Sequence, residues 1–242
     1  ETNTLVREGI EKIINPFDTY ALEEGIRIKE RVGESSVSVI SMGPPQTEDA
    51  LREAISLGAD EAYLLSDRKF AGADTWATAV TLAAFINKLN EYDLIICGKQ
   101  TLDGDTGQVG PSLAEKLDIP HVTYVKKIEE IGEKVITVQR MIEEGYEIVQ
   151  SELPILITVV KEINEPRLPR LKGMLMAKKK EIKRIELKDL DLKENEVGLN
   201  GSPTKVIKIF SPEKKGEIIM LNGEVEDVVK KLIKKMRDDK LL

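Results

Sequence analysis

The 242-residue sequence is poor in the side chains that most enzymes use for chemistry, with one cysteine, one histidine and one tryptophan. A single cysteine excludes an intrachain disulfide or a cysteine-rich metal site, and a single histidine excludes a multi-histidine metal centre within the chain. No apolar run approaches the ~20 residues of a membrane span, and no signal peptide is visible. A net charge of −7 argues against general affinity for nucleic acid. We therefore expect a soluble, cytoplasmic protein that binds no nucleic acid and has neither a metal site nor catalytic residues of its own.

Aromatic residues make up 4% of the chain, so aliphatic side chains must build the core of one large domain, or of one domain with an arm. Up to about residue 125, amphipathic helical patterns alternate with short apolar runs. The predicted helices are residues 16–31, 47–57, 75–89 and 111–117, and the predicted strands are residues 36–42, 61–65, 93–97 and 121–125. This alternation predicts an α/β fold with a doubly wound, mostly parallel, Rossmann-like sheet.

The pattern changes after residue 125. Runs at 135–141, 146–150 and 155–160 predict an antiparallel extension of the sheet. From residue 164 the apolar periodicity is lost among prolines and basic clusters, which predicts an irregular arm that embraces a partner. Residues 205–210 then predict a strand and residues 224–236 an amphipathic helix. We therefore divide the chain into an α/β nucleotide-binding or flavin-binding domain, 1–163, and a recognition loop with a C-terminal arm, 164–242.

A loop rich in glycine and aspartate follows the predicted strand at 93–97, with the sequence GKQTLDGDTGQVGP at residues 98–111. Ligands of open α/β sheets bind at the carboxyl ends of strands, and glycines before a helix start favour phosphate. The loop matches neither a Walker A sequence nor the spaced glycine fingerprint of dinucleotide-binding folds. Nucleotide binding and a plain glycine-rich connection therefore both remain open from these residues alone. Asp103 and Asp105 are a weak signal for magnesium.

Two further loops should meet this one at the same edge of the sheet. Asn15 and Asp18 open the first predicted helix, where simple capping explains them as well as ligand contact does. Met42 ends a predicted strand and precedes a Gly-Pro turn. His121 and Cys97 favour structural roles, because one begins a strand and the other ends a buried one. A nucleotide pocket without an acid–base set suggests a binding or redox role in which a cofactor supplies the chemistry.

Several of these segments together resemble the beta subunit of electron transfer flavoproteins. They are NPFD at 15–18, the loop at 98–111, Leu153-Pro154, and NEPR at 164–167 followed by Leu171, Met174 and AKKK at 177–180. The resemblance runs from about residue 5 to at least residue 190. It departs at the front, where the family has a strand and a nucleotide-contacting loop, so we expect that N-terminal strand to be absent from this chain.

The resemblance implies a heterodimer with an alpha subunit that carries an electron-transferring FAD, while the beta subunit binds an adenine nucleotide. Carried over position by position, the nucleotide contacts are Asn15, Pro16, Phe17, Asp18, Met42, Gly98, Lys99, Gln100, Thr101, Leu102, Asp103, Gly104, Asp105, Thr106, Gly107, Gln108 and Val109. The loop that docks a partner dehydrogenase corresponds to Asn164, Glu165, Pro166, Arg167, Leu171, Met174, Ala177, Lys178, Lys179 and Lys180, with Leu171 at the position of the anchoring leucine.

Residues 104–109, GDTGQV, together with Asp18 resemble the electron-bifurcating or Fix-type branch more than the AMP-binding branch. That branch implies FAD in the beta pocket and NADH as the electron donor. One electron would pass to ferredoxin or flavodoxin, and the other through the alpha-subunit flavin to a dehydrogenase or quinone oxidoreductase. The alternatives are a non-bifurcating beta subunit with structural AMP and, in another class, a freestanding nucleotide-binding regulatory domain that would not need the arm. Association of the complex with a membrane is left open.

Overall fold

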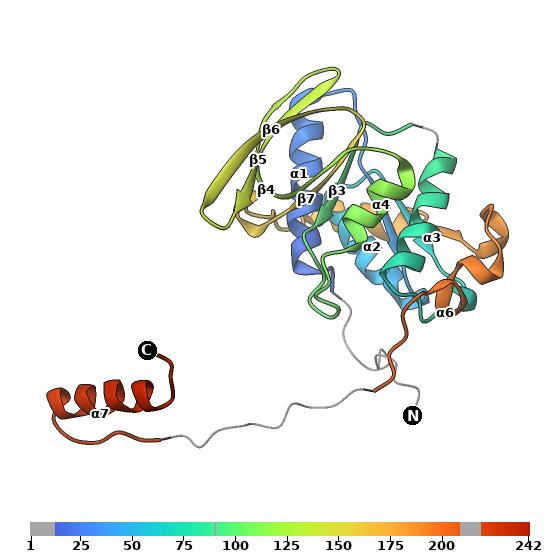
Figure 1. The fold of residues 1–242 in the computed structure, drawn as a ribbon. Helices are drawn as coiled ribbons and strands as arrows, with labels where there is room; N and C mark the ends of the chain where they lie inside the picture. The colour runs from blue at the N-terminus through green and yellow to red at the C-terminus, as the bar shows by residue number, and fades with distance from the viewer. Residues whose placement is uncertain (1–12, 90, 209–218) are drawn as a thin grey trace. The chain divides into compact units, whose positions relative to one another are not determined.

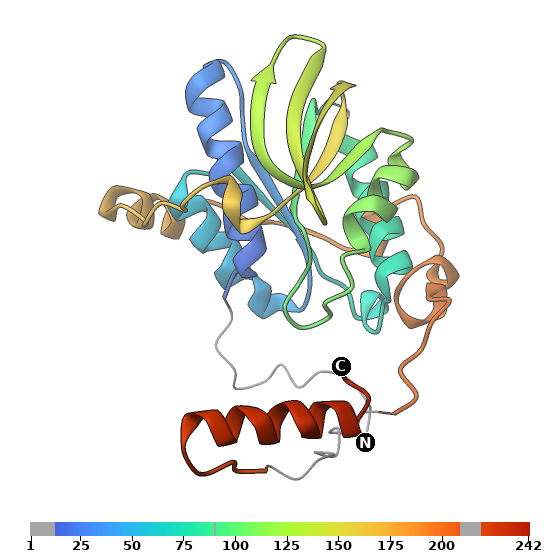
Figure 2. The same cartoon turned by 60° about the vertical axis from the view of Figure 1, so that its left-hand side comes forward.

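The computed structural model describes residues 13–89, 91–208 and 219–242 of the chain (Figures 1 and 2). It has two compact units, Glu1–Val206 and Ile207–Leu242. The larger unit contains the helices α1 (Pro16–Val32), α2 (Glu48–Leu57), α3 (Thr75–Leu89), α4 (Val109–Leu117), α5 (Leu171–Lys179) and the short α6 (Gly198–Gly201). Its strands are β1 (Ser38–Met42), β2 (Glu61–Leu65), β3 (Leu94–Gly98), β4 (His121–Ile131), β5 (Val135–Ile142), β6 (Gly145–Glu152), β7 (Ile155–Val159) and β8 (Lys183–Ile185).

The described strands form two sheets. The first has the order β1-β2-β8 and is parallel throughout. The second has the order β3-β7-β4-β5-β6, in which β3, β7 and β4 are parallel and β4, β5 and β6 are antiparallel neighbours. The prediction of a mostly parallel α/β fold with an antiparallel extension is confirmed, with its parallel strands divided between two sheets.

Strand β7 shows how the second sheet is covered on both faces. Ile157 and Val159 pack in one apolar cluster with Ala21 of α1, while Leu156 packs in another with residues of α3 and α4. Successive side chains of a strand point to opposite faces, so a strand buried on both sides needs an unbroken apolar run. That explains why residues 155–159 read ILITV without alternation.

Helices α1 and α3 each contribute to the cores of both sheets. Ala21 of α1 packs on the second sheet, whereas Leu22 and Ile26 of the same helix pack with α2 and β2 of the first. On the other side, Phe85 of α3 packs on the first sheet and Ala83 on the second. The two sheets therefore share their helical layers, which is the doubly wound arrangement expected from the sequence.

The prediction of an irregular arm after residue 164 was wrong in two places. Residues 171–179 form helix α5, and residues 183–185 form β8, which pairs in parallel with β2. Both elements depend on contacts with distant parts of the chain, β8 on β2 and α5 on α2, since a three-residue charged strand and a helix containing a glycine have weak local signals. The predicted strand at 205–210 is also wrong for residues 205–208, which form no strand, and residues 209 and 210 lie outside the described residues.

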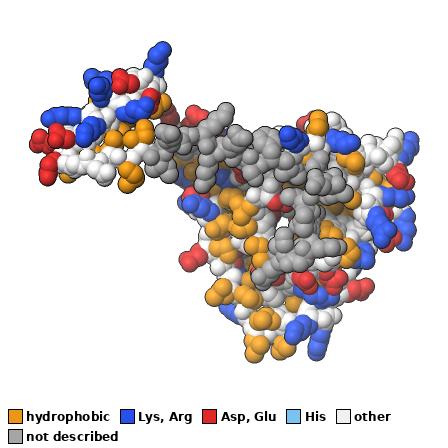
Figure 3. Space-filling model, turned by 90° about the horizontal axis from the view of Figure 1, so that it is seen from below, with side chains coloured by type: hydrophobic (Ala, Val, Ile, Leu, Met, Phe, Trp, Pro, Cys, Tyr) orange, Lys and Arg blue, Asp and Glu red, His pale blue; other side chains and the backbone are white. Residues whose placement is uncertain are grey.

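The second unit contains α7 (Val225–Asp238), which confirms the amphipathic helix expected near the C-terminus. Val225, Val229 and Leu232 lie on one stripe and are all exposed, and apolar side chains gather beside lysines and arginines on this unit (Figure 3). No helix in the described part of the chain has both the length and the apolar character to cross a membrane.

Candidate functional site

The loop at residues 98–109 leaves the carboxyl end of β3 and enters α4, as predicted from the sequence. The first turn of α1 lies directly against its beginning. A Cβ atom on Gly98 would lie 2.6 Å from both the backbone carbon and the Cβ of Phe17, so this approach requires a glycine. The loop and the NPFD segment, far apart in the sequence, are therefore in contact at one edge of the sheet.

Asn15 and Asp18 bind the loop. The Asp18 Oδ1 atom accepts a hydrogen bond from the Gly98 N–H at 2.7 Å. Asn15 donates from Nδ2 to the Gln100 carbonyl at 2.9 Å and to Asp18 Oδ2 at 2.8 Å, and its Oδ1 accepts from the Leu102 N–H at 3.3 Å. Asn15 occupies the N-cap position of α1, as expected, and its carbonyl accepts from the Asp18 and Thr19 N–H groups, but its side chain makes no cap hydrogen bond.

Burial raises the pKa of Asp18, although the hydrogen bonds from Asn15 and Gly98 act in the opposite direction. Burial, together with the nearby negative charge of Asp18, raises the pKa of the Cys97 thiol to about 12. Cys97 is therefore a thiol at physiological pH and a poor nucleophile, as the sequence interpretation expected.

The middle of the loop is open to solvent. Residues 101–106 are exposed, and the loop is held by its own hydrogen bonds, such as Asp105 N–H to the Thr101 carbonyl at 3.0 Å. At its end, the Thr75 hydroxyl of α3 donates to Gln108 Oε1 at 3.0 Å. Met42 ends β1 and is partly buried against the cluster that contains Tyr63 and Phe85. Exposed polar groups in this loop remain available to a ligand.

Beside the loop lies a hollow of about 730 Å³. Two of its lining residues, Phe17 and Lys99, belong to the predicted cofactor contacts. The other lining residues were missed by the sequence analysis, because they come from β4, β5 and the segment after β7: Tyr124, Arg140, Met141, Ile142, Glu143, Val160, Lys161 and Glu162. No spacing rule connects these segments, so only the tertiary structure brings them together.

Two cationic side chains that line the hollow, Lys99 and Arg140, differ in their partners. The Lys99 Nζ atom lies 4.9 Å from the Phe17 ring centre and 5.9 Å from that of Tyr124, and it forms no ion pair with a described residue. The buried Nε atom of Arg140 has no hydrogen-bond partner within the described residues, although its Nη2 atom donates to Thr123. The Nη1 atom of Arg140 lies 3.8 Å from a Glu147 carboxylate oxygen, so of these two side chains it is Lys99 that has its charged group available to a ligand.

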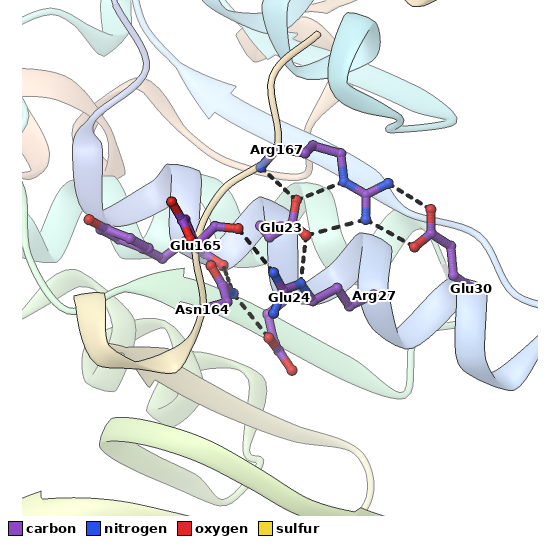
Figure 4. Close-up of polar contacts among 8 residues, drawn as sticks. Glu23, Glu24, Arg27, Glu30, Asn164, Glu165 and Arg167 are labelled. Atoms are coloured by element: carbon purple, nitrogen blue, oxygen red, sulfur yellow. Dashed lines mark hydrogen bonds and ion pairs between the residues drawn. The ribbon is translucent and has the colours of Figure 1, made fainter. Parts of the chain in front are cut away.

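The NEPR segment is bound to α1 (Figure 4). The Arg167 guanidinium donates to both oxygens of Glu23 and to both oxygens of Glu30, at distances from 2.6 to 3.2 Å. Arg27 donates from Nε to Glu23 at 2.6 Å and from Nη2 to the Glu165 carbonyl at 3.0 Å. Asn164 donates to the Tyr20 carbonyl and to Glu24. Among the predicted docking residues, these polar side chains already hold the segment to its own chain.

The charges in this cluster explain how Glu23 is tolerated with a side chain only 4% exposed. Burial acts to raise the pKa of Glu23, but the hydrogen bonds from Arg167 and Arg27 outweigh it and lower the pKa. The hydrogen bond from Arg167 also lowers the pKa of Glu30. At pH values above 4.5, the ordinary pKa of a glutamate, both carboxylates are therefore ionised and stabilise the attachment.

Helix α5 is seated on α2. A Cβ atom on Gly173 would lie 2.2 Å from the Ser56 carbonyl oxygen, so the two helices approach at a glycine. Ala177 is buried in this contact, and Arg52 of α2 donates to the Ala177 and Lys180 carbonyls at the end of α5. The same segment exposes several apolar side chains, which are Leu168, Leu171, Met174, Leu175 and Met176, and three lysines at the end of α5, which are Lys178, Lys179 and Lys180.

Fold and loop together define a doubly wound α/β protein whose candidate ligand site lies at the carboxyl ends of parallel strands. Comparison with known proteins identifies the family, because residues 2–190 match the electron transfer flavoprotein domain. The chain is similar to the electron transfer flavoprotein subunit beta of Thermoanaerobacterium thermosaccharolyticum, with 54% identity over 238 residues, 97% of this chain and 90% of the relative.

Two further relatives come from named complexes or systems. The caffeyl-CoA reductase-Etf complex subunit CarD of Acetobacterium woodii is 45% identical over 243 residues, covering 100% of this chain and 92% of the relative. The protein FixA of Azotobacter vinelandii is 45% identical over 227 residues, covering 90% and 80%. The chain therefore belongs to the electron transfer flavoprotein family, as a beta subunit, and the resemblance found in the sequence is confirmed.

The attachment of the NEPR segment can be tested by Arg167→Gln, with Arg170→Gln as the matched control, because Arg170 is an exposed arginine of the same segment. We expect a loss of about 1–3 kcal/mol in the free energy of unfolding or of local opening, since the buried Glu23 loses one of its two cationic partners. Amide hydrogen exchange of residues 164–180 should quicken in the first variant only.

The same pair of variants has a distinct pH signature. In the unaltered chain the stabilisation from Glu23 is present above pH 4.5 and is lost as the pH falls through the lowered pKa of the folded state. Arg167→Gln should therefore make stability depend less steeply on pH as the pH falls below about 4.5. Identical exchange and pH profiles in both variants would contradict the assigned attachment.

The attachment of the cofactor loop can be tested by Asp18→Asn. The amide can accept only through its oxygen, so its NH₂ group must face either the Gly98 N–H or the Asn15 amide, and one hydrogen bond is lost. We expect a loss of about 1–2 kcal/mol in stability and about tenfold weaker binding of adenine nucleotides, measured by calorimetry. Asp118→Asn, at an exposed left-handed position that suits asparagine, is the control. Unchanged nucleotide affinity would show that the loop is positioned without Asp18.

Proposed function

We propose that this chain is the beta subunit of an electron-bifurcating complex, with FAD rather than AMP in its pocket and NADH as the electron donor. The observation that carries the proposal is the hollow beside the cofactor loop, which shares Phe17 and Lys99 with the predicted nucleotide contacts. AMP has no part that would need such a second space, whereas a flavin dinucleotide does. The names of two relatives, a caffeyl-CoA reductase-Etf complex subunit and FixA, agree with this branch.

The residues present fit a flavin. Aromatic walls from Phe17 and Tyr124 suit a planar ring system, and the ammonium group of Lys99 suits its carbonyl oxygens. The adenosine and phosphate end would be held by Asn15–Asp18, Met42 and Gly98–Val109. Bound FAD would supply the redox chemistry, which consists of accepting a hydride from NADH and releasing single electrons. This chain would need no acid or base of its own for that chemistry.

The exposed side of α5 is the surface proposed to meet a partner dehydrogenase or quinone oxidoreductase. Leu171 is 73% exposed and begins α5, among the exposed apolar residues that we call the ridge: Leu168, Leu171, Met174, Leu175 and Met176. Lys178, Lys179 and Lys180 lie at the other end of the helix. An apolar anchor beside positive charge suits an acidic partner surface. The hydrogen bonds of Arg167 to α1 and the packing of α5 on α2 hold this segment in place. Helix α7, whose apolar stripe is exposed, is proposed to pack on the alpha subunit, and ferredoxin or flavodoxin to receive the low-potential electron.

The cofactor proposal is tested by co-expressing the full chain with its alpha subunit and counting bound nucleotides after denaturation. We expect two FAD per heterodimer, and NADH should bleach the absorbance of both. One FAD together with one AMP per heterodimer would contradict the proposal and support the AMP-binding alternative. Stable nucleotide binding with no association to an alpha subunit would instead favour a freestanding regulatory domain.

The docking proposal is tested by Leu171→Ala, with Leu199→Ala as the control, because Leu199 is an exposed leucine of the same unit that lies off the ridge. We expect the KM for the partner to rise about tenfold or more, since an anchor is worth about 1.5–2 kcal/mol. Flavin content, thermal stability and NADH-driven reduction of a small artificial dye should not change. An unaltered KM would assign the ridge another role.

A further inference from the structure

Tyr124 adopts a backbone conformation that large residues rarely take. Its φ is +59°, in the left-handed region, and it lies where the pairing of β4 with β7 shifts register between Val122 and Val125. Such a bulge inserts an extra residue and turns a side chain to a new direction. Strained residues persist when the surrounding structure holds them, and they concentrate at ligand sites.

The bulge changes which side chains of β4 face the core. In a regular strand residue 124 would share a face with Val122. In this structure Val122 and Val125 both pack in the apolar cluster beneath the sheet, and the Tyr124 ring is 43% exposed. The Tyr124 N–H donates to the hydroxyl of Thr158, a residue 2% exposed, at 3.2 Å, so the bulge is bound to the interior of the neighbouring strand. The conformation therefore presents the ring at the surface while the flanking valines stay buried.

The ring lines the hollow already described, in the company of Phe17 and Lys99. Glu143 and Glu162 line it together with Lys99, Arg140 and Lys161, so its charges nearly balance, which suits a neutral group better than a phosphate with two negative charges. A neutral planar ring with carbonyl acceptors suits it better, because an electron-rich phenol stacks well on an electron-poor ring. The adenine end of the ligand would lie elsewhere, on the loop from Gly98 to Val109.

From this geometry we infer that the Tyr124 ring stacks on the flavin ring. This contact lets the pocket distinguish a flavin adenine dinucleotide from an adenine nucleotide that has no flavin. The inference rests on the proposed function, and it adds a specificity-determining residue that lies in none of the sequence motifs. It predicts that Tyr124 contributes to the affinity for FAD and not to that for ADP, which is the part of FAD without the riboflavin.

The test uses the full chain co-expressed with its alpha subunit and freed of the beta-bound nucleotide by dialysis. Tyr124→Gly removes the ring and keeps the bulge, because glycine adopts a φ of +59° without strain. Tyr124→Phe keeps the ring and removes the hydroxyl. Tyr146→Ala is the matched control, since Tyr146 is an exposed tyrosine on β6 that also lies under a lysine, Lys126 at 4.2 Å, but does not line the hollow. FAD and ADP are titrated separately by calorimetry, and flavin fluorescence is recorded.

We expect the unaltered complex to bind FAD at least about tenfold more tightly than ADP, as stacking on one aromatic ring provides. Tyr124→Gly should abolish most of that preference, leave the ADP affinity unchanged and brighten the bound flavin, whereas Tyr124→Phe and Tyr146→Ala should keep it. A preference for FAD that survives Tyr124→Gly would overturn this inference alone. Equal affinity for FAD and ADP in the unaltered complex would overturn the proposed cofactor as well.

Discussion

The first turn of α1 lies directly on the carboxyl end of β3, and this close approach constrains the whole cofactor side of the protein. It needs a residue without a side chain at position 98, where a Cβ would lie 2.6 Å from Phe17. Asp18 uses the resulting proximity to accept the Gly98 N–H, and Asn15 binds the backbone two and four residues further on. Phe17 and Lys99 consequently lie side by side at the hollow, although they are 82 positions apart in the chain.

The same helix also carries the attachment of the segment proposed to dock a partner. Glu23 and Glu30 hold Arg167 further along α1, within a helix whose first turn holds the cofactor loop. This helix packs into the cores of both sheets through Ala21, Leu22 and Ile26, so any shift of the helix would disturb both cores. A single packed element therefore fixes the separation between the candidate cofactor loop and the segment proposed to dock a partner.

The alternation of helices and strands could be predicted because each buried strand is an apolar run with a turn at its end, as ILITV in β7 shows. The NPFD segment and the glycine-rich loop could be paired because carboxyl ends of parallel strands meet at one edge. The roles within them could not. Asn15 is a residue type typical of helix N-caps, yet its side chain binds the loop 85 residues away, because the close approach at Gly98 brings that backbone within reach. Arg167 was expected to contact a partner protein, yet its guanidinium forms ion pairs with two carboxylates of α1.

By itself the amino-acid sequence determined the fold class, the family resemblance and the position of the glycine-rich loop, since periodicity and local motifs are properties of neighbouring residues. Only the tertiary structure decided which side chains line the hollow and which side of the recognition segment is free. Tyr124 reaches the hollow because a register shift between β4 and β7 turns it outward, and α5 forms because Gly173 and Arg52 seat it on α2. These outcomes depend on the alignment of segments distant in the chain, and no local pattern specifies that alignment.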